Sequence, residues 1–86
     1  MPNRVEILNE VRLPPRPSGR RLCFQNCIYH YDNGDDPENG FRFIWRLENG
    51  NLQPARGQAR IPTARHLRRL LELAENAGWL PADAPN

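Results

Sequence analysis

Apolar and polar residues alternate over much of the first half of the chain. In residues 5–13, every second residue is apolar except Asn9, so these apolar side chains are expected to share one face. Residues 20–31 form a second run, rich in aromatic and branched side chains, and residues 41–48 alternate most regularly. Period-two alternation is typical of half-buried strands. The pattern therefore predicts three strands, over residues 5–13, 20–31 and 41–48.

Turn-forming residues separate these runs. Residues 14–19 contain three prolines and end in glycine, and residues 32–40 contain four acids, two asparagines and two glycines. Asn49 and Gly50 form the preferred pair for a two-residue type I′ turn, in which both residues take a positive φ. Such a turn places Leu47 opposite Leu52 and predicts a return strand at the edge of the sheet.

A helix is predicted after residue 61. Thr63 suits the N-cap position, or Pro62 the first turn. Gly78 stands where a left-handed residue ends a helix, and Trp79 after it is expected to pack back on the last turn, at Ala74. Apolar residues between these signals recur every three or four positions, which predicts one buried stripe. The stripe consists of Ala64, Leu67, Leu70, Leu71, Ala74 and Ala77.

The elements together predict one small α+β domain. A chain of 86 residues has room for a single core. We expect an antiparallel β-meander of three to four strands, followed by one C-terminal amphipathic helix packed on one sheet face. This domain is predicted to span residues 1–80, with residues 81–86 as a frayed tail.

Composition narrows the expected location. No stretch approaches the roughly 18 apolar residues of a membrane helix, and the first residues lack the apolar segment of a secretory signal. The two cysteines, Cys23 and Cys27, are fewer than the disulfide framework typical of a small secreted domain. We therefore expect a cytoplasmic protein without a membrane partner.

Few residues suggest chemistry. Cys23, Cys27 and His30 could ligate a metal, but cysteines four apart on a strand lie about 13 Å from each other, at about 3.3 Å per residue. The acids of residues 32–40 lack the EF-hand pattern. Ser18, the only serine, lies in a turn, and neither His30 nor His66 belongs to a nucleophile motif. The sequence predicts no metal, no cofactor and no catalytic site.

Charge is distributed unevenly along the chain. All 12 basic residues are arginine, which a GC-rich codon bias or a preference for bidentate anion recognition would explain. The net charge is +2, yet residues 41–69 hold seven arginines against Glu48 alone, a local charge of +6. These candidate contacts for phosphates or other anions are Arg42, Arg46, Arg56, Arg60, Arg65, Arg68 and Arg69.

The predicted helix carries its charges in the order opposite to the one its dipole favours. Three arginines occupy its first two turns, whereas its two acids, Glu72 and Glu75, come later. Arg65 and Arg69 also form a like-charge pair four residues apart, although Glu72 can pair with Arg68 or Arg69. If nothing offsets the stability cost of these charges, they indicate a functional surface. The alternative is that the arginines only keep the surface of the helix solvated.

Two functions fit these patterns. The first is a small non-enzymatic interaction or assembly module, with an unknown protein partner or self-association. The alternative is a nucleic-acid-binding module that places the arginine-rich hairpin and helix N-terminus on phosphates. The order of strands and helix is also broadly similar to that of small three-strand-plus-helix DNA-binding domains, a likeness of topology alone. The modest isoelectric point of about 8.9 and the acidic residues 32–38 favour the first function, whereas the local charge of +6 and the inverted helix charges favour the second.

Overall fold

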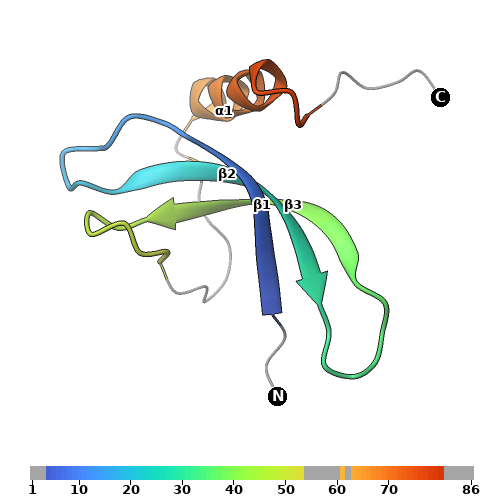
Figure 1. The fold of residues 1–86 in the computed structure, drawn as a ribbon. Coiled ribbons are helices and arrows are strands. Elements are labelled where there is room, and N and C mark those ends of the chain that lie inside the picture. Colours follow the sequence, from blue (N-terminus) through green and yellow to red (C-terminus); the bar gives the residue numbers. More distant parts are fainter. Residues whose placement is uncertain (1–3, 54–60, 62, 81–86) are drawn as a thin grey trace.

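The fold is a three-stranded antiparallel sheet with one helix on one face, as the computed structural model shows for residues 4–53, 61 and 63–80 (Figure 1). The elements are β1 (Arg4–Arg12), β2 (Arg21–His30), β3 (Glu38–Arg46) and α1 (Ala64–Asn76). The strand order β1-β2-β3 makes a meander, and α1 contacts β1 and β2. The predicted α+β class is confirmed. Within these residues, no helix is long and apolar enough to span a bilayer.

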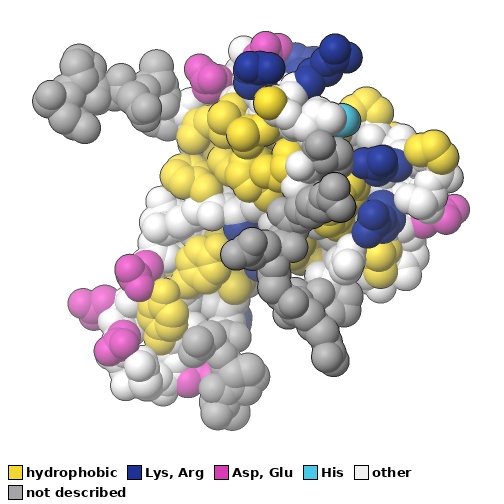
Figure 2. All heavy atoms as spheres, turned by 180° about the vertical axis from the view of Figure 1, so that it is seen from behind, with side chains coloured by type: hydrophobic (Ala, Val, Ile, Leu, Met, Phe, Trp, Pro, Cys, Tyr) yellow, Lys and Arg dark blue, Asp and Glu magenta, His cyan; other side chains and the backbone are white. Residues whose placement is uncertain are grey.

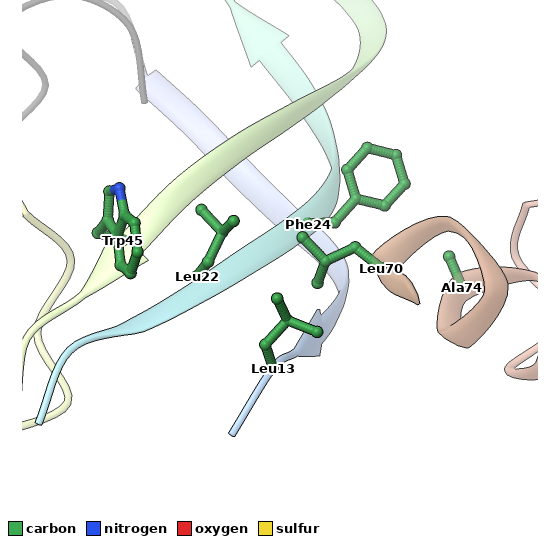
Figure 3. Packing of buried hydrophobic residues seen from close by; sticks show 6 residues of the cluster. All are labelled: Leu13, Leu22, Phe24, Trp45, Leu70 and Ala74. Atoms are coloured by element: carbon green, nitrogen blue, oxygen red, sulfur yellow. The ribbon is translucent and has the colours of Figure 1, made fainter. Parts of the chain in front are cut away.

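The core lies between α1 and the sheet face that it covers (Figure 3). Alternate residues of β2 and β3 point into it, because neighbouring side chains on a strand face opposite sides. Leu70 and Ala74, one turn apart on α1, are fully buried against this face. Burying a leucine side chain stabilises a fold by about 1.5–3 kcal/mol. In a core this small, each buried side chain therefore contributes a large share of the stability. The central cluster is Leu13, Leu22, Phe24, Trp45, Leu70 and Ala74.

A β-bulge divides β1 into two halves. Asn9 pairs with Asn26 and Ile7 with Cys27, so Leu8 has no partner of its own on β2. An extra residue reverses the facing of everything before it. Residues 5 and 7 therefore lie on the face away from α1, while residues 11 and 13 lie on the helix face. The prediction that these four apolar residues share one face was wrong.

The turn after β3 differs from the predicted one. Gly50 has φ of +89°, and no described residue other than glycine has a positive φ, so Asn49 does not take the type I′ conformation. The N–H of Gly50 donates to Leu47 O at 2.8 Å, and the N–H of Leu47 donates to Asn51 O at 2.7 Å. This is a three-residue loop that ends in a glycine bulge. Leu47 therefore opposes Asn51, not Leu52, and the predicted register was wrong by one residue.

Strand ends also shift. β3 begins at Glu38, three residues earlier than predicted, because Glu38 pairs with Tyr29 and Asn39 with Ile28. The amide of Asn39 donates to Cys27 O at 2.7 Å, which holds the start of β3 on β2. Leu52 forms only an isolated bridge with Arg46, and residues 54–60, where the fourth strand was predicted to run, lie outside the described residues.

Both predicted ends of the helix are confirmed. The hydroxyl of Thr63 accepts from the His66 N–H at 3.2 Å, as an N-cap does. Gly78 has φ of +88° and donates to Glu75 O, and Trp79 N–H donates to Ala74 O. These two bonds form a Schellman motif. Pro62 and the predicted tail, residues 81–86, lie outside the described residues.

Candidate interaction surfaces

Arg42 and Arg46 lie on the sheet face opposite α1, where they complete a partly buried polar network. Arg46 donates to both carboxylate oxygens of Glu10, from Nε at 2.7 Å and from Nη2 at 2.8 Å. The amide of Gln25 donates to Glu10 at 2.6 Å, and Arg42 Nε donates to Gln25 Oε1 at 2.7 Å. Arg12 also pairs with Glu10. The guanidinium of Arg46 is therefore committed to the fold.

The network sets the acidity of its central carboxylate. Burial by itself would raise the pKa of Glu10. Hydrogen bonds from Arg46, Gln25 and Arg12 outweigh burial and lower that pKa from 4.5 to about 2. Glu10 is therefore ionised at any physiological pH, and it neutralises arginines that would otherwise repel each other.

The three helix arginines lie elsewhere. Arg65, Arg68 and Arg69 are exposed on α1, because the buried Leu70 and Ala74 turn its other side to the sheet. Arg69 pairs with Glu72. The sheet and the core therefore lie between the helix arginines and Arg42 and Arg46. The remaining two candidates, Arg56 and Arg60, lie outside the described residues.

Two other arginines, from the β1–β2 turn, lie over the ring of Trp45 instead. The Cζ atoms of Arg20 and Arg16 lie 4.6 Å and 5.8 Å from the centroid of the Trp45 ring, within cation–π range. A small cavity next to them is lined by residues of the β1–β2 turn, by Trp45 and by His66 of α1. The turn and the first helical turn are therefore neighbours.

These residues make up what we call the basic surface. It joins the β1–β2 turn to the exposed side of α1 and is composed of Arg16, Arg20, Arg65, His66, Arg68 and Arg69. Arginine side chains are seen on α1 and at the right-hand end of the sheet in Figure 2. Sequence reasoning missed Arg16 and Arg20, because 25 and more residues separate them from Trp45 in the chain.

An exposed aromatic ring marks the helix-side face of β3. Phe41 is 49% exposed, although its ring stacks on the buried Phe24 at 5.7 Å between centroids. Trp79, which follows α1, stacks on Phe24 at 5.5 Å and lies 6.5 Å from Phe41. We call Phe41 with Trp79 the aromatic surface. Its rings are fixed by stacking and yet open to solvent, which favours contact with another molecule.

The acidic loop, residues 32–38, extends from the far end of the same sheet. Asp32, Asp35 and Asp36 are exposed, and Glu38 accepts from the Tyr31 hydroxyl at 2.8 Å. The Asp35 N–H donates to Asn33 Oδ1 at 3.0 Å, which shapes the turn. Acidic side chains gather at the lower left of Figure 2, where this loop lies. The loop thus places negative charge at the end of the sheet remote from the basic surface.

The cysteines and His30 do not meet. Cys23 and Cys27 are free, fully buried thiols on the face away from α1, and burial raises the pKa of Cys23 to about 11. His30 lies on the other face and contacts Glu6 at 3.0 Å. Among the described residues, no three His, Cys, Asp or Glu side chains form a group that could hold a metal ion.

The comparisons with known proteins add no family to this description. The chain matches no protein-family model, no curated protein and no solved structure.

Proposed function

We propose that this chain is a small non-enzymatic interaction or assembly module that docks a protein partner on its aromatic surface. The observation that carries the proposal is Phe41, half exposed in a rigid stack with Phe24 and Trp79. A large ring that is already immobilised loses little entropy on binding, so it contributes more to affinity than a free side chain. Aromatic residues of this kind dominate protein interfaces.

The surroundings of Phe41 suit such a contact. Asn26 pairs with Phe41 across β2 and β3, and the amides of Asn26 and Asn39 form hydrogen bonds beside it, Asn26 to Asn9 at 3.1 Å and Asn39 to Asn26 at 2.8 Å. An apolar centre with a polar rim is the usual anatomy of an interface. A cytoplasmic location also belongs to this proposal, and the free, buried state of Cys23 and Cys27 supports it.

Sedimentation velocity over a wide range of protein concentration tests whether the partner is the chain itself. We expect the mass to rise with concentration and Phe41→Ser to suppress that rise. The matched control is Ile7→Ser, because Ile7 is 38% exposed but lies on the other sheet face. Equal effects of both changes would reject the aromatic surface as the site.

A nucleic-acid-binding function is the second candidate, and the basic surface favours it. Arg16 and Arg20 enlarge the cluster on α1, and the first turn of α1 contains no acidic residue to offset it. Guanidinium groups at this density suit phosphates. The salt dependence of binding to duplex DNA tests this candidate, since a phosphate-binding surface loses affinity steeply as salt rises.

A further inference from the structure

The two ends of the sheet differ in the charge of the loops that they carry. Because β2 lies between β1 and β3, the acidic loop between β2 and β3 is at one end of the sheet and the β1–β2 turn is at the other. The basic surface extends from that turn over the start of α1. Figure 2 shows a group of acidic side chains at the lower left, and arginines at the top and right, where further acidic side chains accompany them.

We propose that the partner of the aromatic surface is a second copy of this chain, docked head to tail. The basic surface of one copy would lie on the aromatic surface and acidic loop of the next. This inference rests on the proposed function, because it assigns the partner of that site. It adds the basic surface as the second half of the contact.

The charges oppose a two-fold dimer in which the acidic loops of the two copies meet. A two-fold dimer centred on both the aromatic surface and the acidic loop would bring the same patch of both copies together, and with it both acidic loops. Like charges facing each other across an interface oppose association, whereas a positive patch on a negative one favours it and fixes the orientation. A head-to-tail contact instead pairs the basic surface of one copy with the acidic loop of the next and avoids this repulsion.

The β1–β2 turn has the shape and stiffness that the contact requires. Arg16 is exposed between prolines at positions 15 and 17, and its N–H donates to Arg20 O at 2.8 Å. Gly19 donates to Arg16 O at 2.7 Å and packs against Glu48, where an added Cβ would lie 2.8 Å from the Glu48 Cβ. Prolines dock well on aromatic rings because they lose little freedom on binding. An adjacent guanidinium can then reach the carboxylates of the acidic loop.

A complementation experiment tests the arrangement. Arg16→Glu with Arg65→Glu makes both ends acidic, and Asp35→Arg with Asp36→Arg makes both ends basic. Each double variant alone should associate at least about tenfold more weakly than the native chain, and an equimolar mixture of the two should associate again, because opposite ends are restored between them. Sedimentation velocity measures all three samples.

A control variant separates the effect of charge in the acidic loop from the effect of the net charge of the protein. Glu72→Arg with Glu75→Arg adds as much positive charge as the acidic-loop variant, but on α1, and it should leave association intact. Circular dichroism establishes that each variant folds. If one does not, salt provides an independent measurement on the native chain: added salt should dissociate a head-to-tail contact, whereas an apolar symmetric dimer should persist.

The outcomes are distinguishable. Recovery in the mixture, together with native assemblies larger than a dimer, supports head-to-tail docking. A closed dimer that ignores charge reversal and salt overturns it but leaves the aromatic surface in place. A native chain that stays monomeric at every concentration overturns docking of a second copy, and the proposed assembly role with it. Loss of duplex DNA binding in the Arg16 and Arg65 variant, with association unchanged, would assign the basic surface to nucleic acid and reject its role here.

Discussion

Arg46 at the end of β3 donates hydrogen bonds to both carboxylate oxygens of Glu10 on β1, although β2 runs between the two strands. The pair therefore bridges the two outer strands of the sheet over the central one. Bidentate guanidinium–carboxylate contacts are strong and orientation-specific. Beneath this bridge Cys23 and Gln25 are fully buried, on the sheet face opposite α1.

The Glu10 network predicts a pH dependence of stability. The pKa of Glu10 is lowered on folding from 4.5 to about 2, so the folded state binds fewer protons than the unfolded state below pH 5. Its stabilisation is therefore complete above about pH 5 and is lost as pH falls towards 2. The loss is at most about 3 kcal/mol, and less where water screens the carboxylate. Urea melts from pH 7 to 2 measure it, and Glu10→Gln should flatten the profile. An unchanged profile would contradict the role assigned to Glu10.

The two hairpin turns predict unequal effects of the same change. Gly19 and Gly50 both have φ of +89°, but open space surrounds Gly50, whereas Glu48 blocks Gly19. Gly50→Ala should cost about 1–2 kcal/mol through backbone strain, and Gly50→Val at least as much. Gly19→Ala should cost more, because Glu48 must also move. Thermal melts compare the stability of the variants. Equal losses of stability would show that Glu48 does not pack against Gly19.

The helix core predicts a third comparison. Leu70 is fully buried, whereas Leu71 next to it is only half buried. Leu70→Ala should destabilise the fold by about 2–5 kcal/mol, enough to unfold a domain of marginal stability. Leu71→Ala should cost clearly less. Denaturant titrations followed by circular dichroism distinguish the two, and the reverse ranking would mean that α1 is rotated from the orientation described.

The helix arginines predict that binding and stability respond in opposite directions. Arg65 and Arg69 are exposed, and Arg65 lies in the first turn of α1, at the positive end of the helix dipole. The double change to alanine should leave stability equal or slightly higher, because it removes an unfavourable dipole interaction and a like-charge pair, and the Arg69–Glu72 pair that it also removes is exposed and contributes little. If the basic surface holds nucleic acid, the same change should weaken duplex binding and flatten the salt slope by about one unit per lost contact. Binding that is absent even at low salt would reject that function.

Local signals predicted α1 well because the residues that decide its ends are adjacent in the chain. Thr63 and Gly78 act within one turn of the helix, and the apolar stripe follows its 3.6-residue period. The turn at Asn49 and Gly50 was harder to predict, since this pair suits both a two-residue turn and a three-residue loop that ends in glycine. The hydrogen bond from Arg46 Nη1 to Gly50 O at 2.6 Å accompanies the longer one.

The bulge in β1 left only a faint signal. Asn9 occupies an apolar position and Leu8 a polar one, which marks where the regular alternation fails. The bulge reverses the faces of residues 5 and 7 only because of the register in which β1 pairs with β2. That register cannot be read from a short segment of sequence. The basic surface was missed for a similar reason, since Arg16 and Arg20 meet Trp45 only after three strands have assembled. Tertiary contacts thus decided what local patterns could not.

The meander order has a consequence for how the chain folds. Each strand pairs only with its neighbour in sequence, so both hairpins can close over short loops without waiting for distant segments. Topologies dominated by such near contacts fold faster than those that need long-range pairing. The bridge from Arg46 to Glu10 joins residues 36 apart and requires both hairpins. It should therefore form late, and its loss should accelerate unfolding far more than it slows folding.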